Sequence, residues 1–366
     1  MKSETSPSQY ALFLAVLPKY RQACIDSLIG SLGDDLKILV SESHLDETVK
    51  TGISPELYRR VPMARLLRKK FFIQGGVQNV VGTPNLVLDL NPRSLSSWWL
   101  LVVRKVLRGK RTLVWGHIHP QAGSDAKTAP LRLAMRRLAD GTISYTYRDR
   151  AKALADLPTE PVWVAPNSLY PLDLMVPPAT PGLQRNSVLY VGRFEPAKKV
   201  DLLVRGFAIA AASLPELRLT LVGGGSEQAK LKDLVNQLGV EEKVNFAGWI
   251  DEPEALKSHY STAIATTSTG FAGLGLTQSL GFGVPMIVAR DENHSPEIEL
   301  ADSGGVTWFE SDSAEALAES IREAWHKREQ LPNASISEFT KKRYSAEAMA
   351  DGLRTALQGL PQSLPD

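Results

Sequence analysis

The sequence predicts an α/β protein built from two doubly wound, Rossmann-like domains. Its 366 residues exceed what one hydrophobic core usually contains. Short apolar runs rich in β-branched residues alternate with helical patterns along the whole chain, and strands separated in this way by helices form parallel sheets. A stretch with four prolines, "YPLDLMVPPATPGLQRNS" (residues 170–187), reads as a linker between the two halves.

Twelve apolar runs are the expected strands, because each is short and is bounded by turn residues or by a helical pattern. The first half contains "ALFLAVL" (11–17), "LKILVSE" (36–42), "NLVLDL" (85–90), "RTLVWGHIH" (111–119), "TISYTY" (142–147) and "PVWVAPN" (161–167). The second half contains "SVLYVGRF" (187–194), "LRLTLVGGG" (217–225), "KVNFAGWI" (243–250), "STAIATTS" (261–268), "VPMIVAR" (284–290) and "GVTWFES" (305–311). We place the domains at residues 1–177 and 178–338, followed by a helical segment at residues 339–366.

Charge is distributed unevenly between the halves. Residues 1–177 hold 24 Lys and Arg against 15 Asp and Glu, whereas the remainder holds 18 against 25. The basic half should meet something anionic. The sequence has no basic-aromatic repeats and no zinc-ligand spacing, so we expect no nucleic acid and favour an anionic membrane surface or a phosphate-bearing acceptor.

The segment "LSSWWLLVVRKVLRGKR" (residues 95–111) combines tryptophans, aliphatic residues and five cations. We interpret it as a core-facing helix with a basic outer side, and docking on a membrane is the alternative. No apolar stretch approaches the roughly 20 residues that a bilayer requires, and the first apolar run ends at Pro18, too early for a secretory signal. We expect a cytoplasmic protein, peripheral on the inner face of the plasma membrane. The one cysteine, Cys24, should be a buried thiol without redox chemistry.

A pair of cations follows the first strand of the second half. Gly192 and Arg193 end that strand, and Lys198 precedes the next helix. In open α/β sheets the ligand binds at the carboxyl ends of the strands. The planar fork of Arg193 and the point charge of Lys198 suit a diphosphate, and solvated loop charges are the less favoured alternative.

Two glycine-rich turns follow later strands. Gly223 and Gly224 end one of them, where glycine permits a close backbone approach to a ligand. The stretch "STGFAGLGLTQSLGFGVP" (residues 268–285) has five glycines and no charge. Its backbone N–H groups and the short helix that follows predict an anion cradle. Gln278 in that helix can hydrogen-bond a ligand hydroxyl.

In this order and spacing, the motifs between Ser187 and Arg328 resemble the C-terminal domain of the family-4 retaining glycosyltransferases. These enzymes have the GT-B fold, two Rossmann-like domains facing a cleft. The resemblance is carried by "VGRFEPAKKVDLLVRGF", "LVGGG", "VNFAGWI", the glycine loop with "GVP", and "HSPEIE". It implies that Arg193 and Lys198 bind the donor diphosphate and that a terminal helix crosses back to the first domain.

The resemblance also implies a set of donor-binding residues. The backbone of Trp249 and Ile250 would contact the base. The glycine loop would wrap the donor sugar. The residues concerned are Gly192, Gly223, Gly224, Trp249, Ile250, Gly270, Ala272, Gly273, Leu274, Gly275, Leu276, Gln278 and Glu297.

The chain departs from the family at two glutamates, eight residues apart, that hold the donor sugar and the ribose. Those positions are Gly270 and Gln278 here. This degenerate pattern resembles a subgroup of polysaccharide-assembly transferases in which a neutral polar residue replaces the second glutamate. Glu297 matches an acid that the family often keeps near the donor, although a helix-capping role is as well supported, and His294 is a weaker candidate.

His117 and His119 end the strand "RTLVWGHIH" in the first half, with both imidazoles on one side if the strand persists. Metal binding, substrate contacts and ordinary loop polarity remain open, and metal is the least favoured because no acid or cysteine has ligand spacing. The resemblance supports His117 as a catalytic residue facing the cleft. The acceptor candidates are Tyr20, Arg21 and His119, with Tyr145, Tyr147 and Arg148 as weaker ones.

The function that we expect is a metal-independent, retaining glycosyltransferase of the hexosyltransferase type. It would move a sugar from a nucleotide diphosphate sugar to a saccharide acceptor, which we expect to be lipid-linked, in cell-surface polysaccharide, exopolysaccharide or lipopolysaccharide assembly. No cofactor is expected besides the donor. A non-catalytic GT-B protein that binds a glycan or a partner enzyme is the alternative. A sugar-nucleotide epimerase is a third hypothesis, but it would need more acids in the cleft.

Overall fold

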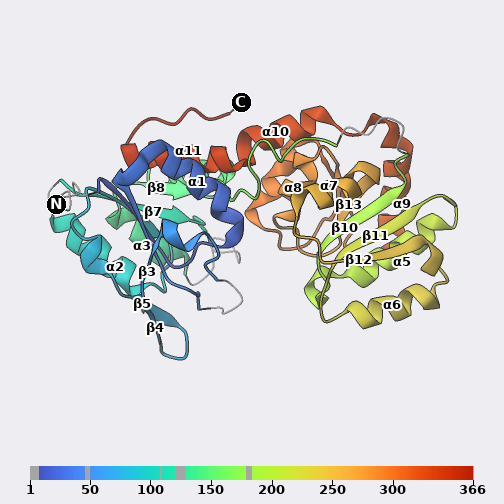
Figure 1. Ribbon diagram of the computed structural model, residues 1–366, viewed down its shortest axis with the longest axis horizontal. Coiled ribbons are helices and arrows are strands. Elements are labelled where there is room, and N and C mark those ends of the chain that lie inside the picture. Colours follow the sequence, from blue (N-terminus) through green and yellow to red (C-terminus); the bar gives the residue numbers. More distant parts are fainter. Residues whose placement is uncertain (1–7, 46–49, 108, 120–127, 179–183, 366) are drawn as a thin grey trace. The chain divides into compact units, whose positions relative to one another are not determined.

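The structure is a computed structural model that describes residues 8–45, 50–107, 109–119, 128–178 and 184–365 (Figure 1). The chain divides into two compact units. Unit 1 comprises Met1–Pro171 together with Ala346–Asp366, and unit 2 comprises Leu172–Ser345. Each unit contains a parallel sheet with helices on both faces, which confirms the predicted α/β class with two Rossmann-like sheets.

Unit 1 is built on a seven-stranded sheet with the order β3-β2-β1-β6-β7-β8-β9, and all neighbouring strands are parallel. The strand order reverses between β1 and β6, which makes their carboxyl ends the topological switch point of the sheet. The strands are β1 (Tyr10–Leu14), β2 (Leu36–Val40), β3 (Arg59–Arg60), β6 (Asn85–Asp89), β7 (Arg111–Gly116), β8 (Thr142–Ser144) and β9 (Val162–Val164).

The sequence predicts six of these seven strands and misses β3 as well as an antiparallel hairpin. The hairpin consists of β4 (Met63–Leu66) and β5 (Phe71–Gln74). Both missed elements are short, and β3 is two exposed arginines, so neither shows the apolar runs from which the other strands are recognised.

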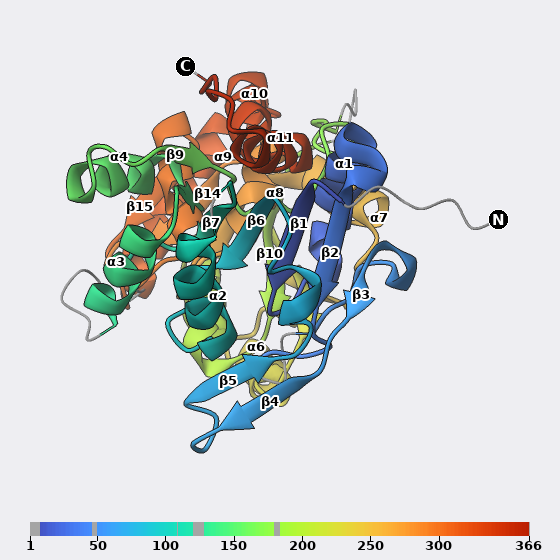
Figure 2. The same ribbon diagram turned by 90° about the vertical axis from the view of Figure 1, so that its left-hand side faces the viewer.

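The helices of unit 1 cover both faces of its sheet, as period-two alternation of apolar side chains along buried strands requires. One face packs against α1 (Gln22–Leu32) and α11 (Ala346–Gln358). The other packs against α2 (Leu95–Val106), α3 (Ala129–Leu138) and α4 (Tyr147–Asp156), as Figure 2 shows for α2 and α3. None of the described helices is both long and apolar enough to cross a bilayer.

Unit 2 has a six-stranded parallel sheet with the order β12-β11-β10-β13-β14-β15. Its switch point lies between β10 and β13. The strands are β10 (Ser187–Arg193), β11 (Arg218–Gly224), β12 (Val244–Gly248), β13 (Ala263–Ser268), β14 (Met286–Ala289) and β15 (Val306–Phe309), and the sequence predicts all six.

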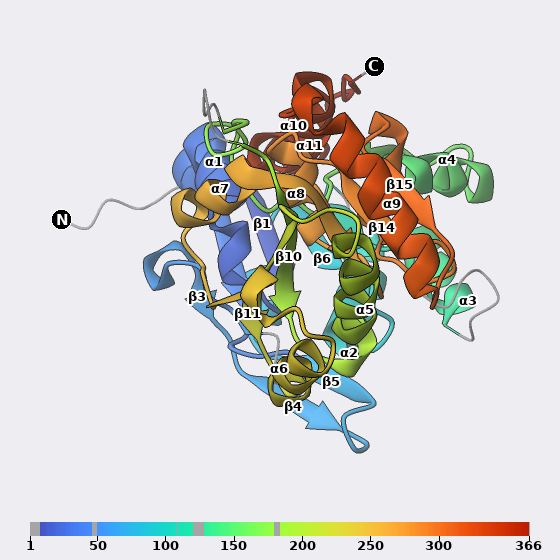
Figure 3. The same ribbon diagram turned by 90° about the vertical axis from the view of Figure 1, so that its right-hand side faces the viewer.

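The helices of unit 2 are α5 (Val200–Ala211), α6 (Gln228–Gln237), α7 (Pro253–Thr262), α8 (Gly275–Gly281), α9 (Ala314–Lys327) and α10 (Ala334–Tyr344). On one face of the sheet, α5, α6 and α9 enclose the main hydrophobic core, and α5 and α9 lie side by side (Figure 3). Elsewhere in the unit, α8 packs against α10.

The observed unit boundaries differ from the predicted ones, which lie after residues 177 and 338. The chain leaves unit 1 after Pro171 and returns to it at Ala346. The predicted terminal segment is two helices: α10 belongs to unit 2, where the Ser337 hydroxyl donates to the Gly281 carbonyl at 2.7 Å, and only α11 belongs to unit 1. Apolar positions run through both helices, so the sequence pattern does not show the break.

Glycine permits the close packing of α11 on the sheet of unit 1. A Cβ at Gly352 would lie 1.9 Å from the carbonyl oxygen of Val164 in β9. Because Gly352 has no side chain, α11 can approach β9 more closely than any other residue at this position would allow.

The polarity of α2 is a correction to the sequence interpretation, which gave this helix a basic outer side. Arg104 is 1% exposed and points inward. Its guanidinium donates to the Thr112 hydroxyl and to the carbonyl oxygens of Val80, Val81, Thr83, Pro84 and Arg111. Burial lowers the pKa of Arg104 to about 10, yet the group stays charged at neutral pH and ties α2 to two neighbouring segments, residues 80–84 and the start of β7.

Replacing Arg104 should therefore destabilise unit 1. Arg104→Leu removes the donors of several buried carbonyl groups, and each unsatisfied buried group costs roughly 1–3 kcal/mol, so we expect a total loss of at least about 3 kcal/mol. Lys105→Leu is the matched control, because its only described ion pair, with Asp140, is on the surface. Urea unfolding followed by circular dichroism measures both, and equal unfolding midpoints for the two variants would contradict the structural role of Arg104.

Candidate functional site

The site in unit 2 is organised by two loops that meet at the switch point. The 3-10 helix η5 (Pro196–Lys198) follows β10, and the glycine loop follows β13. A Cβ at Gly270 would lie 2.3 Å from the carbonyl oxygen of Ala197, so only glycine fits there. We call this contact, formed by residues 197–199 and 269–271, the loop clamp.

Hydrogen bonds from the side chains of Lys198 and Thr269 fasten the loop clamp. The Lys198 ammonium donates to the carbonyl oxygen of Phe271 at 2.8 Å and lies 4.2 Å from the centroid of the Phe271 ring. The Thr269 hydroxyl lies 3.0 and 2.8 Å from the carbonyl oxygens of Lys198 and Lys199. Lys198 is therefore held at the carboxyl edge of the sheet in a fixed position.

The electrostatics of the clamp favour an anion. Burial and the nearby Arg193 guanidinium lower the pKa of the Lys198 ammonium to about 8. Arg193 is exposed and forms no ion pair with any residue in the described part of the chain. Lys199, in contrast, is paired with Asp312 and Glu292, whose hydrogen bonds raise its pKa. Arg193 and Lys198 are thus two neighbouring cations that an anion would stabilise.

The predicted donor glycines near β11 also have structural reasons to be glycine. At Gly223, with φ of 131°, a Cβ would lie 1.9 Å from the Gly192 carbonyl oxygen. A Cβ at Gly224 would lie 2.9 Å from the indole nitrogen of Trp249, whose side chain is 62% exposed. The structure thus brings Gly192, Gly223, Gly224 and Trp249 together at one edge of the sheet, and Ile250 follows Trp249 directly after β12.

The "HSPEIE" motif holds the glycine loop from its other side. His294 Nδ1 accepts from the Ala272 N–H at 3.1 Å, while Nε2 lies 2.8 Å from the Ala289 carbonyl oxygen. These contacts require the neutral tautomer with the proton on Nε2, and burial lowers the pKa of His294 accordingly. The backbone N–H and hydroxyl of Ser295 both donate to the Ala272 carbonyl oxygen at 2.9 Å. His294, a weak candidate from sequence, positions the loop, and Ser295 is a residue that the sequence interpretation did not single out.

The remaining predicted donor residues differ in exposure. Gly273, Leu274 and Gly275 form the turn into α8, whereas Leu276 is 1% exposed and packs inward. Gln278 is 5% exposed, and its carbonyl oxygen accepts from the Tyr260 hydroxyl at 3.0 Å.

Glu297 is also an interior residue. It is 3% exposed, in the 3-10 helix η7 (Pro296–Ser303). In this conformation Gln278 and Glu297 are interior residues of unit 2.

Unit 1 has a cavity of about 480 Å³ at the carboxyl ends of its central strands. Arg21, 8% exposed, forms one wall: it donates to the Tyr145 hydroxyl at 3.1 Å and to the Asn167 side chain at 3.4 Å, and lies over the Trp115 ring. The polar residues of the lining are Tyr20, Arg21, His44, Asp89, Asn91, Arg93, His117, Arg132, Tyr145 and Asn167.

The two histidines after β7 are separated by the fold. β7 ends at Gly116, before either histidine. The prediction that both imidazoles lie on one side depended on the strand continuing through His119, and it does not. His117 lines the cavity, with its ring 4.8 Å from that of Tyr145. His119 is not among the described residues that line it, and neither are Tyr147 and Arg148, which begin α4.

Asp89 is a cavity residue that the sequence interpretation missed. It ends β6 beside the switch point, and the backbone N–H of Ala15 donates to its carboxylate. Burial raises the pKa of Asp89 to about 6, although that hydrogen bond and the charge of Arg21 act in the opposite direction. Its position, a carboxylate at the carboxyl end of a central strand, could have indicated a site residue. Because Asp89 lies inside the run "NLVLDL", the sequence interpretation treated it only as part of a strand.

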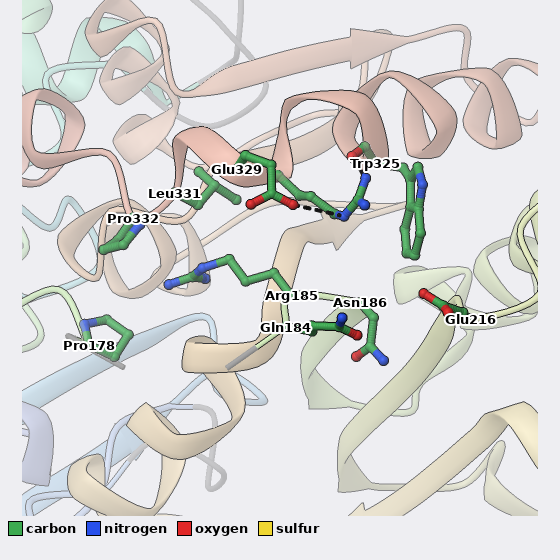
Figure 4. A pocket seen from close by; sticks show the side chains of 10 residues that line it. Pro178, Gln184, Arg185, Asn186, Glu216, Trp325, Glu329, Leu331 and Pro332 are labelled. Atoms are coloured by element: carbon green, nitrogen blue, oxygen red, sulfur yellow. Dashed lines mark hydrogen bonds and ion pairs between the residues drawn. The ribbon is translucent and has the colours of Figure 1, made fainter. Parts of the chain in front are cut away.

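A further cavity of about 380 Å³ lies beside Trp325 and Arg185 (Figure 4). Its lining includes Asn186 and Glu216, which precede β10 and β11, so it lies at the amino ends of the strands. Ligands of open α/β sheets bind at the opposite edge. Arg185 is engaged in structure there, donating to the carbonyl oxygens of Tyr260 and Ala263. Among the residues that the structure describes, no group of three His, Cys, Asp or Glu is placed to hold a metal ion.

Comparison with known proteins agrees with this geometry. Residues 179–343, which are nearly all of unit 2, match the family "Glycosyl transferases group 1". The fold is similar to that of Anabaena HepE in complex with UDP, with a TM-score of 0.68 and 15% identity over 96% of this chain and 100% of the other. It is also similar to the lipopolysaccharide outer core galactosyltransferase WaaB, with a TM-score of 0.63 and 15% identity over 96% and 99%. At these identities the likeness establishes the fold alone, and it confirms the GT-B prediction.

Curated relatives match shorter stretches. The GtfA subunit of the UDP-N-acetylglucosamine–peptide N-acetylglucosaminyltransferase of Streptococcus gordonii is 34% identical over 101 residues, 28% of this chain and 20% of that protein. The lipopolysaccharide core biosynthesis glycosyltransferase LpsE of Rhizobium meliloti is 29% identical over 136 residues, 37% of this chain and 38% of that protein. The chain therefore matches well under half the length of either relative.

The loop clamp predicts a specific sensitivity at Gly270. Gly270→Ala should lower the free energy of unfolding of unit 2 by about 3 kcal/mol, because the new methyl group collides with rigid backbone. Gly275→Ala, five residues along the same loop, is the matched control: the nearest atom to its Cβ is 3.9 Å away, so the change should stay below about 1 kcal/mol. Thermal melting and amide hydrogen exchange of the loop measure the difference, and tolerance of Gly270→Ala would show that the clamp is wrongly placed.

Proposed function

We propose that the protein is a metal-independent, retaining glycosyltransferase of the hexosyltransferase type that uses a nucleotide diphosphate sugar and needs no further cofactor. The single observation that carries this proposal is the loop clamp, which holds Lys198 beside Arg193 at the switch point of a group 1 glycosyltransferase unit. Two neighbouring cations, together with the loop backbone, provide the charge that a departing diphosphate requires.

The chemistry needs no covalent enzyme intermediate. The bond between the sugar C1 and the diphosphate oxygen breaks as a bond from C1 to the acceptor oxygen forms on the same face. The acceptor hydroxyl proton passes to the leaving phosphate oxygen, so the charges balance. Because the new bond forms on the same face as the broken one, the configuration at C1 is retained. Arg193 can bind two phosphate oxygens with its planar fork, and Lys198 can neutralise a third. The base would lie near Trp249 and Ile250.

The cavity of unit 1 is the acceptor side of this proposal. Its aromatic rings, carboxylate and imidazole are groups that bind saccharide hydroxyls, and we assign His117 to the reacting end, with Tyr20, Arg21 and Asp89 as acceptor contacts. His119 does not line the cavity, so it would contact the acceptor only outside the cavity.

We propose a lipid-linked saccharide acceptor in lipopolysaccharide or other cell-surface polysaccharide assembly. The printed functions of LpsE and WaaB support this assignment. The excess of cations in residues 1–177 supports cytoplasmic, peripheral contact with an anionic membrane.

Removing either cation should reduce turnover far more than stability. Arg193→Ala and Lys198→Ala are each expected to lower kcat by about 100-fold or more, the usual effect of losing one donor to developing negative charge. Lys199→Ala is the control, because that side chain is occupied by Glu292 and Asp312. Sugar transfer from the donor and thermal melting are measured together. Full activity in both alanine variants would make the assignment wrong.

The lowered pKa of Lys198 predicts a pH dependence of diphosphate binding. Near pH 7 the ammonium is charged and binds the anion, whereas above its pKa of about 8 it must first take up a proton. UDP affinity should therefore fall as the pH rises from 7 to 9.5, with proton uptake on binding, and Lys198→Arg should flatten the profile.

The same group acts in the opposite sense on the ligand-free protein. The unfolded chain binds more protons at this site, so its contribution to stability increases as the pH rises above 8. Calorimetry of UDP binding in buffers of different ionisation enthalpy tests the first effect. A UDP affinity that does not change between pH 7 and pH 9.5 would contradict it.

A non-catalytic GT-B protein that binds a glycan or a partner enzyme is a second candidate, favoured by one observation. Gly270 has no room for an acid, and the Gln278 carbonyl oxygen is engaged by Tyr260 inside unit 2. Release of free nucleoside diphosphate from a panel of donors, with and without acceptor extract, separates the two functions. Thermal shifts with UDP, GDP, dTDP and their sugars would identify the donor, because selective binding stabilises by mass action.

A further inference from the structure

Helix α2 has a second apolar face that the fold of unit 1 leaves exposed. Leu100 and Leu101 are buried in the core beneath it. On the outer side, residues spaced by four, three and four positions lie along one stripe of the helix. These residues, which we call the α2 stripe, are Leu95 (37% exposed), Trp99 (47%), Val102 (54%) and Val106 (80%).

The α2 stripe is a built surface and not a frayed end. Ser94 caps the helix by accepting from the Ser97 N–H, and the buried Arg104 fixes its far end. Of the two adjacent tryptophans, Trp98 donates its indole N–H to the Pro92 carbonyl oxygen, whereas Trp99 projects outward. Ordinary surfaces scatter their exposed apolar side chains, so four on one rigid helix face indicate an interaction site.

The surroundings of the stripe are strongly basic. Residues 59–110 contain eleven Lys and Arg and a single acid, Asp89, which lies in the cavity described above. Of these cations Arg104 is buried, and Arg60 and Lys105 pair with Glu42 and Asp140. Several of these cations are exposed on or beside the β4–β5 hairpin: Arg59, Arg60, Arg65, Arg68, Lys69, Lys70 and Arg93. A surface that is both apolar and basic is complementary to a boundary between hydrocarbon and anionic groups.

The hairpin is fastened to the start of α2, and Figure 2 shows the two elements next to each other. Ser96 exchanges hydrogen bonds of 2.9 Å with the backbone N–H and carbonyl of Gln74 in β5. The Arg93 guanidinium donates to the carbonyl oxygens of Lys69 and Lys70. Between the two strands, Leu67 is 71% exposed at the hairpin tip.

We propose that the α2 stripe docks unit 1 on an anionic phospholipid surface, with α2 lying in the interface and the β4–β5 hairpin contacting the headgroups. This inference deepens the membrane contact of the proposed function and rests on it. Trp99 is suited to the interface because its ring is apolar and its N–H is polar. A nucleic acid would leave the apolar stripe without a partner, and a second copy of the chain would bring two basic surfaces together.

Sedimentation with vesicles tests the proposal. The full chain should co-sediment with vesicles of equal parts phosphatidylglycerol and phosphatidylcholine, and only weakly with phosphatidylcholine alone. Trp99→Glu combined with Val102→Glu should lower the bound fraction about tenfold at limiting lipid. Leu238→Glu in unit 2, where the native side chain is 38% exposed, is the matched control and should bind as the unaltered chain does. Arg68→Gln with Lys70→Gln should weaken binding and reduce its dependence on salt.

The outcomes separate this proposal from the transferase assignment. Melting temperature and the UDP-induced thermal shift should be unchanged in the stripe variants, which shows that they fold and keep the donor site. Equal vesicle binding by the Trp99/Val102 variant and the unaltered chain would overturn the proposal. So would binding to heparin without binding to anionic vesicles. A chain that binds vesicles but shows no response to UDP would instead contradict the proposed function.

Discussion

The feature on which the proposed diphosphate site depends most is the contact between two backbones at the loop clamp. The strand order of unit 2 makes β10 and β13 neighbours, so the loops that leave their carboxyl ends must share the same space. They do so because Gly270 has no side chain to oppose Ala197. This contact allows Lys198 to donate a hydrogen bond to the loop and partly buries its ammonium. Burial and the nearby Arg193 lower the pKa of the ammonium, and an incoming anion would stabilise its charged form.

The clamp also accounts for the neutral character of the glycine loop. An acid at position 270 would collide with η5, so the loop has to be fixed by other means. His294 and Ser295 supply them by binding the backbone of Ala272 from the far side. The loop is thereby held between η5 and η7 with its backbone in place, and preorganised backbone groups can stabilise negative charge without carboxylates nearby. A carboxylate, that of Asp89, lines the cavity of unit 1 instead, which suits the proposed division between donor and acceptor.

Sequence patterns predict the sheets of this protein well, because strands and the helices between them depend on local order along the chain. All twelve predicted strands are present, and Arg193 and Lys198 follow the carboxyl end of one of them. The errors concern tertiary partners that no local pattern reports. Asp89 does end a strand, but the sequence does not show that its carboxylate lines a cavity. Arg104 was interpreted as a surface charge because the sequence does not show the carbonyl groups that surround it. Which of His117 and His119 lines the cavity likewise depends on where β7 stops, at Gly116.

The central claim is that Arg193 and Lys198, brought together by the loop clamp, form a diphosphate site. A crystal structure of the full chain with bound UDP tests it most directly. The account predicts both phosphates at the carboxyl ends of β10 and β13, within hydrogen-bond distance of the Arg193 guanidinium, the Lys198 ammonium and backbone N–H groups of the glycine loop. A diphosphate bound instead in the cavity of unit 1, or beside Trp325 at the amino ends of the strands, with no ligand at the clamp, would contradict it.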